Sequence, residues 1–284
     1  MSSVFKLPKV GLEAIKKKKV AFAKELAAEL LGTMLLVMIG CGSAMSGDGE
    51  DGEGQMSEQA QYVRIALAFG LAVATIAQTV GHISGCHINP AITVGLVAGA
   101  KVEVIRGLAY VVAQSLGGLL GAALLNSLVP DNTRGQSGLG STQLGNGVSL
   151  AQGFGIEFFI SLVLVLVVFG AAADENNAAY VKGSAPLAIG LSITACHLFA
   201  IPLTGASMNP ARTLGSNVVA GKFEDLWLYL LAPTLGGLVA GLLYQGMFAA
   251  PSPIGDDSAS VVRKKVSKVL QKDQKDLESQ KPTK

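Results

Sequence analysis

Two copies of one tripeptide give the first chemical signal in this chain of 284 residues. One copy consists of Asn89, Pro90 and Ala91, and the other of Asn209, Pro210 and Ala211. Asn is a favoured N-cap residue and Pro is favoured at the first helical position, so each copy predicts a helix start. A helix start presents unpaired backbone N–H groups and the positive end of the helix dipole. One copy alone would be typical of an ordinary helix start in a loop, whereas the pair predicts two positive helix ends directed at one point.

Arg212 is the second signal, because it is the one charged residue in the otherwise apolar segment 204–221. A charge inside a membrane is costly and is therefore a functional hypothesis by default. The competing interpretation is an arginine that extends its head group to the membrane interface. His197 lies 15 residues earlier. Taken alone it would fit a core histidine.

Two carboxylates, Glu29 and Glu157, stand in long apolar stretches. A buried charge must be paired or hydrogen-bonded, so we expect both to act structurally. A catalytic pair of carboxylates is not favoured, because no nucleophile or set of metal ligands accompanies them. The three cysteines, Cys41, Cys86 and Cys196, lie in apolar runs and predict buried thiols instead of a disulfide framework.

The composition indicates which elements must position these residues. Half of the chain is hydrophobic and only 15% is charged, against about a quarter in ordinary soluble domains. This balance excludes a disordered chain, a disulfide scaffold and a nucleic-acid-binding protein. A membrane span needs about 20 apolar residues. Six stretches reach that length, and they cover residues 22–45, 62–81, 103–128, 150–172, 185–203 and 226–249.

Two further apolar segments, 82–100 and 204–221, are too short to span and are interrupted by Gly and Pro. Short broken segments at matching places in two halves predict discontinuous helices that meet near the middle of the membrane. Irregular backbone at that depth must be buried in protein or line a wet cavity. We expect the residues before each helix, 85–87 and 205–207, to be extended, with their carbonyls forming a ladder of acceptors.

The two halves of the chain repeat one another. Residues 84–95 match residues 204–215, including the tripeptide. Each half holds three spans, an odd number, so the second half is inverted and the short helices enter from opposite faces. The chain therefore divides into a first repeat (22–128), a connecting loop (129–149) and a second repeat (150–249).

Basic residues predict the orientation, since cytoplasmic loops carry an excess of Lys and Arg. With both termini in the cytoplasm, 18 of the 22 basic residues lie inside. The four exceptions are Arg64, Arg134, Arg212 and Lys222. Segments 1–21 and 250–284 are then cytoplasmic, and the connecting loop is extracellular. The first span follows a basic start and is typical of a retained signal-anchor.

The paired boxes, three spans apart, resemble the major intrinsic proteins, the aquaporins, over about residues 22–249. The resemblance implies an all-α membrane protein with six transmembrane helices and two re-entrant half-helices, an inverted repeat in a right-handed bundle. It implies a selectivity constriction formed by Phe69, His197, Ala206 and Arg212. It places along the pore Gly85, Cys86, His87, Gly205 and Ser207. It also makes Glu29 and Glu157 supports of the re-entrant backbone.

The resemblance implies a water channel of the plasma membrane that gives passive, osmotically driven flow and excludes protons and ions. Four chains would assemble, each with its own pore in the lipid bilayer. His197 and Thr213, which stands where glycerol-conducting relatives carry Asp, favour the water-selective branch. We expect no enzyme activity, cofactor, metal or nucleic-acid partner. The alternative is a channel of broader specificity that also passes glycerol or other small neutral solutes. An adhesive junction protein and a coupled transporter are less favoured, because the constriction is complete and the two midplane carboxylates are structural.

Overall fold

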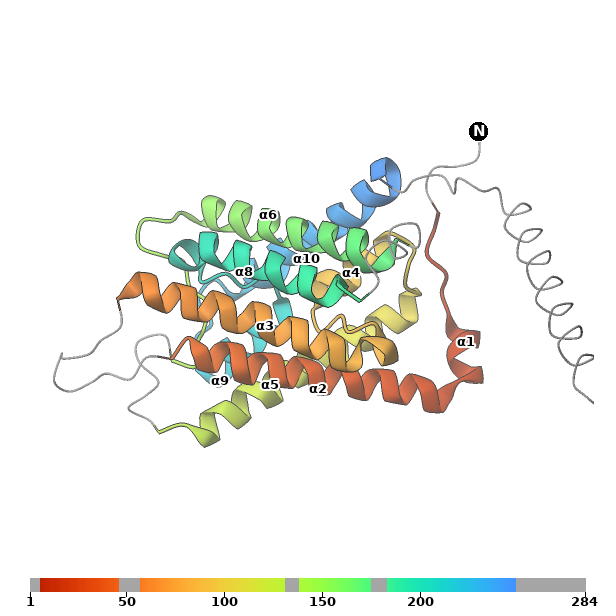
Figure 1. The fold of residues 1–284 in the computed structure, drawn as a ribbon, viewed down its shortest axis with the longest axis horizontal. Helices are drawn as coiled ribbons and strands as arrows, with labels where there is room; N and C mark the ends of the chain where they lie inside the picture. Colours follow the sequence, from red (N-terminus) through yellow and green to blue (C-terminus); the bar gives the residue numbers. More distant parts are fainter. Residues whose placement is uncertain (1–5, 46–56, 131–137, 175–182, 249–284) are drawn as a thin grey trace, which may run out of the picture. The chain divides into compact units, whose positions relative to one another are not determined.

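The computed structural model describes residues 6–45, 57–130, 138–174 and 183–248; the predicted tail 250–284 lies outside the described residues. Six long helices dominate the described part, and several of them run side by side in Figure 1. They are α2 (Lys19–Ser43), α3 (Glu58–Ser84), α5 (Val104–Leu128), α6 (Leu150–Val168), α8 (Ala185–Thr204) and α10 (Leu226–Leu243). Two π-helical turns, Phe169–Ala173 and Tyr244–Phe248, continue α6 and α10. All six are long and apolar enough to cross a membrane, which confirms the predicted spans.

Three short helices complete the described part: α1 (Leu12–Lys17), α4 (Pro90–Ala98) and α9 (Pro210–Val219). The half-helices α4 and α9 begin where the two tripeptides predict. The Asn89 side chain accepts a hydrogen bond from the Ala91 N–H at 2.8 Å, and the Asn209 side chain accepts from the Ala211 N–H at 3.0 Å. Both helix starts are therefore capped, with proline in the first turn.

The half-helix of each repeat packs against the other repeat. Helix α4 packs mainly on α10 and α9 mainly on α5, so each half-helix lies against the third span of the other repeat. Gly118 of α5 faces the backbone carbonyl of Ala211, and Gly237 of α10 faces that of Ala91. A Cβ at either glycine would collide with backbone, so only glycine permits this approach.

The half-helices enter from opposite ends of α5. The end of α4 leads directly into the start of α5. The end of α9 instead contacts the segment that follows α5, where Thr142 and Asn217 exchange two hydrogen bonds of 3.1 Å. In Figure 1, α4 and α9 accordingly lie toward opposite ends of the long helices. This is the inverted arrangement expected from two halves of three spans.

The segments before the half-helices differ from the expected extended backbone. Their left-handed residues have φ between 44° and 88°, and they are Gly85, Cys86, Ile88, Gly205, Ala206 and Met208. Left-handed backbone is unfavourable for residues with a Cβ and persists only where surrounding contacts hold it. The chain therefore turns sharply after α3 and α8.

The segments at either end of α5 are more ordered than the predicted loops. Before the helix, the carbonyls of Lys9 and Val10 accept hydrogen bonds from the first-turn N–H groups of Val104 and Ile105 at 2.9 and 3.1 Å. After it, Leu139 is buried. The N-terminal segment thus caps α5, and the described part of the connecting loop packs into the protein.

Candidate functional site

A cavity of about 320 Å³ passes between the two repeats and is lined by residues from both. Phe69, His197 and Arg212 line one part of it, and Lys101 and Val102 line another. Asn89 and Asn209 line it too. Apolar residues of the long helices make up most of the remaining wall, among them Leu36, Val73, Leu164 and Ile193. The cavity therefore presents a few polar groups along a largely apolar passage.

The two capping asparagines bind each other's segments. Asn89 Nδ2 donates to the Met208 carbonyl at 2.8 Å, and Asn209 Nδ2 donates to the Ile88 carbonyl at 2.9 Å. These bonds cross between the repeats and bring the starts of α4 and α9 together. Each amide carries two N–H groups and uses one in the cross-bond, which leaves one N–H per asparagine.

Glu29 is fully buried and holds the first re-entrant segment. Its two oxygens accept from the backbone N–H groups of His87 at 2.9 Å and Ile88 at 2.7 Å. The Ser84 hydroxyl and the Gln114 amide donate to it at 2.6 and 2.7 Å. Four donors thus surround one carboxylate, as a buried charge requires.

Glu157 holds the second re-entrant segment in the same way. It is fully buried and accepts from the backbone N–H groups of Ser207 and Met208, both at 2.9 Å. The Thr204 hydroxyl donates to it at 2.7 Å. Each carboxylate therefore binds the turn whose left-handed residues would otherwise be unfavourable.

The constriction residues Phe69, His197 and Arg212 lie together. The Phe69 and His197 ring centroids are 4.7 Å apart, and the Arg212 guanidinium carbon lies 5.1 Å from the centroid of the Phe69 ring. The Arg212 side chain is buried and donates to the Ser216 hydroxyl at 3.2 Å. This placement is inside the protein, not the interfacial position of a snorkelling arginine.

Two polar atoms of this group have no hydrogen-bond partner among the described residues: His197 Nε2 and Arg212 Nε. His197 Nδ1 lies 3.0 Å from the Ile193 carbonyl, which can only accept, so Nδ1 carries the proton. In the neutral ring, Nε2 is then an acceptor, while Arg212 Nε–H is a donor. A buried polar group without a partner is costly, so both atoms favour a bound polar molecule.

Most of the predicted pore-lining residues border the cavity: Gly85, Cys86, His87 and Ser207. The His87 ring nitrogen Nδ1 lies 3.1 Å from the Thr93 hydroxyl, which keeps the ring against α4. The Ser207 hydroxyl bonds with the Thr213 hydroxyl at 2.7 Å.

Gly205 and Ala206 are not among the residues that line this cavity, so their expected place along the pore stays a prediction. A Cβ built on Gly205 would face Thr142 of the connecting loop. Ala206 is fully buried in the hydrophobic core, and its N–H donates to the Thr204 hydroxyl at 3.2 Å.

The supporting role of two tyrosines was not predicted from the sequence. The Tyr110 hydroxyl donates to the Ser84 carbonyl at 3.0 Å, and the Tyr229 hydroxyl donates to the Thr204 carbonyl at 2.9 Å. Both stand seven residues before a matching glycine of the repeat, so extending the alignment would have paired them. Among the described residues, no group of three His, Cys, Asp or Glu side chains is arranged to hold a metal ion.

Comparisons with known proteins agree with this geometry. The profile of the Major intrinsic protein family matches residues 16–244. The chain is 42% identical to Aquaporin-1 of Homo sapiens over 235 residues, 83% of this chain and 86% of the relative. It is 39% identical to Aquaporin-2 of Bos taurus over 246 residues, 87% of this chain and 86% of the relative. Its fold is similar to that of the aquaglyceroporin from Plasmodium falciparum, with a TM-score of 0.69 and 25% identity over 80% of this chain and 96% of that one.

Proposed function

The chain belongs to the major intrinsic protein family and is a water channel, not an enzyme; we propose that water crosses it passively along the cavity flanked by Asn89 and Asn209. The observation that carries this proposal is the pair of cross-bonds between the two boxes. They place two helix starts, and two remaining amide N–H groups, beside one passage.

The asparagine pair orients a water molecule and interrupts proton transfer. A water oxygen that accepts from both amides has its hydrogens directed away along the passage. Proton hopping needs a continuous donor–acceptor chain, and this orientation breaks it. The positive ends of α4 and α9 add a barrier to cations, since half-helix ends of this kind exclude protons in water pores.

The group of Phe69, His197 and Arg212 selects the permeant. A water molecule there donates to His197 Nε2 and accepts from Arg212 Nε–H, the two atoms that lack partners among the described residues. The adjacent rings narrow the passage. Glycerol is wider and carries apolar C–H groups, so we infer that water passes in preference.

The membrane placement is part of the proposal. The outer faces of the spans expose large apolar side chains, for example Leu71, Leu120, Phe159 and Leu191, which supports contact with lipid. We assign the channel to the plasma membrane with both termini in the cytoplasm. A homotetramer with one path per chain is the assembly that the resemblance implies.

Permeability of the reconstituted protein tests this function. We expect proteoliposomes to shrink faster than bare liposomes in an impermeant osmolyte, and to show little added glycerol flux. Shrinkage at the bare-liposome rate would contradict the proposal. Glycerol flux comparable to that of water would favour the broader-specificity alternative.

Arg212→Val tests the charge barrier. A unit charge contributes about 4 kcal/mol at about 4 Å in an effective dielectric near 20, so we expect proton conductance to rise by more than about tenfold. The exposed Lys24→Val serves as the matched loss of one positive charge and should leave proton exclusion intact. Unchanged proton exclusion in Arg212→Val would show that the positive ends of α4 and α9 exclude protons without the Arg212 charge.

A further inference from the structure

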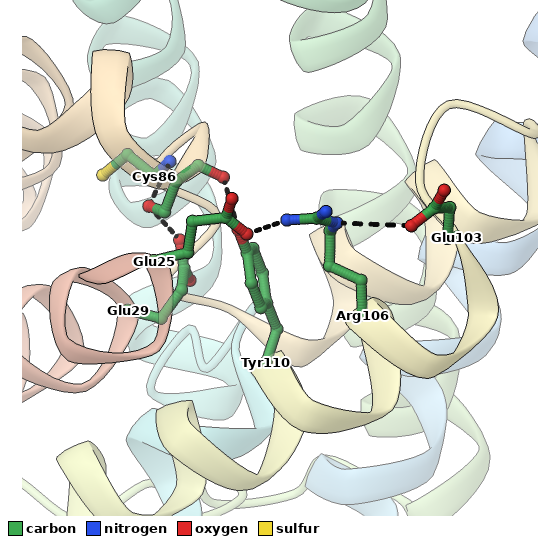
Figure 2. A network of polar contacts seen from close by, with 7 residues as sticks. Glu25, Glu29, Cys86, Glu103, Arg106 and Tyr110 are labelled. Carbon is green, nitrogen blue, oxygen red and sulfur yellow. Dashed lines mark hydrogen bonds and ion pairs between the residues drawn. The ribbon is translucent and has the colours of Figure 1, made fainter. Parts of the chain in front are cut away.

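A network of polar contacts lies behind the first re-entrant segment and joins α2 to α5 (Figure 2). Glu25 of α2 forms an ion pair with Arg106 of α5. Arg106 Nε also lies 3.7 Å from Glu103, and its guanidinium carbon lies 5.5 Å from the centroid of the Phe22 ring. The Glu25 and Arg106 side chains are only 17% and 24% exposed, so the pair is largely shielded from solvent.

Tyr110 connects this ion pair to the passage. Its hydroxyl lies 3.1 Å from Glu25 Oε2 and 3.0 Å from the Ser84 carbonyl. A tyrosine hydroxyl has one proton, so it can donate to only one of these acceptors at a time. Arg106 binds the same Glu25 oxygen that the tyrosine reaches.

The Ser84 acceptor belongs to the start of the re-entrant segment. The Ser84 hydroxyl donates to Glu29 and accepts from the Cys86 N–H at 3.0 Å. Ser84 and Cys86 line the cavity, and the His87 and Tyr110 rings pack edge to face, with 5.1 Å between their centroids. The acceptor to which the Tyr110 hydroxyl donates therefore determines how firmly the start of the first re-entrant segment, which lines the cavity, is held.

The second repeat provides a natural comparison that lacks the ion pair. Tyr229 is equivalent to Tyr110 and donates to the Thr204 carbonyl. The positions equivalent to Glu25 and Arg106, counted from Glu157 and Tyr229, are Gly153 and Asp225. The competing carboxylate and its arginine thus belong to the first repeat.

We propose that the Glu25–Arg106 ion pair is a positioning element for the first re-entrant segment. A carboxylate is a stronger acceptor than a neutral carbonyl, so the Tyr110 hydroxyl would donate its hydrogen bond to an unpaired Glu25 instead of to the Ser84 carbonyl. Arg106 donates to that Glu25 oxygen, so the Tyr110 hydroxyl donates to the Ser84 carbonyl. The proposal rests on the proposed function only in that this segment lines the water path.

Labelling of Cys86 tests the proposal independently of water flow. Cys41 and Cys196 are replaced by alanine in the full chain, so that Cys86 is the one remaining thiol. The purified protein in detergent reacts with N-ethylmaleimide, and mass spectrometry gives the labelling rate. Loss of one hydrogen bond, typically worth about 1 kcal/mol, corresponds to about a fivefold change.

We expect Tyr110→Phe and Arg106→Gln each to raise the Cys86 labelling rate by about fivefold. The double variant Glu25→Gln with Arg106→Gln should return within about twofold of the parent, because no bare carboxylate then competes for the proton. Tyr229→Phe, in the other repeat, and Glu103→Gln, which removes only the 3.7 Å contact, should leave the rate unchanged.

An unchanged rate in Arg106→Gln would overturn the proposal. So would a double variant that labels as fast, or folds as poorly, as Arg106→Gln alone, since a packing role of Arg106 predicts no rescue. Water permeability of the parent proteoliposomes is measured in parallel. Its absence would contradict the proposed function, while the labelling series would still decide the role of the ion pair.

Discussion

At the scale of single residues, Glu29 and Glu157 have the same structural role but differ in the hydrogen-bond donors that surround them. Both are fully buried, and each binds two consecutive backbone N–H groups of a left-handed turn. Glu29 has an additional donor in Gln114, whereas no equivalent side-chain amide is found on Glu157 among the described contacts. We therefore infer that the second turn depends more heavily on its carboxylate.

We expect Glu157→Gln to destabilise the protein by about 1–3 kcal/mol, because the amide NH₂ would face a backbone donor and leave it unsatisfied. The measurement is the thermal unfolding temperature of the purified protein in detergent, together with water permeability. Glu13→Gln, at a surface ion pair whose glutamate side chain is 76% exposed, is the control and should change neither. An unfolding temperature equal to the parent's would contradict the anchoring role.

At the scale of elements, glycines allow close backbone approaches both between the half-helices and the spans and between spans of one repeat. Gly118 and Gly237 contact the half-helices, and Gly117 and Gly236 bring spans of one repeat together at the carbonyls of Leu30 and Phe158. Small residues are favoured at such contacts because the helices gain packing only when their backbones approach closely. The position of α9 therefore depends on Gly118 of α5, which has no side chain to hold the two helices apart.

We expect Gly118→Ala to push α9 away from α5, since its Cβ would collide with the Ala211 backbone. Overpacking of this kind costs about 1–3 kcal/mol, so thermal stability and water permeability should both fall. Gly155→Ala in α6 is the matched control, because a Cβ there meets nothing within 4 Å and alanine favours the helix. Equal stability of both variants would show that the contact is not tight.

Local chemistry explains what the sequence could predict of these elements. Apolar length predicts the spans, and asparagine followed by proline predicts the first residues of α4 and α9. Helix α3 nevertheless continues three residues beyond its predicted end to Ser84, because Gly85 terminates it in the left-handed conformation. The turned backbone at Ala206 and the contact of Thr142 with Asn217 were not predicted, since both depend on residues distant in the chain.

At the scale of the whole chain, its described ends lie near each other. The Gln245 side chain, just after α10, donates to the Lys6 carbonyl at 3.1 Å. The segment that contains Lys6 also caps the start of α5 through Lys9 and Val10. Six spans must return the chain to the side on which it began, and this hydrogen bond agrees with that count.

The basic residues predict which side this is. With 18 of 22 Lys and Arg on the side of both ends, the positive-inside rule places that side in the cytoplasm. Residues 48–58 lie between the first two predicted spans and are therefore extracellular in this orientation. We expect an epitope inserted there to bind antibody on intact cells, and epitopes at either terminus to bind only after permeabilisation. Water permeability of each tagged protein is the control for folding. Labelling of one terminus in intact cells would contradict the six-span count, whereas labelling of both would invert the orientation and leave the count unchanged.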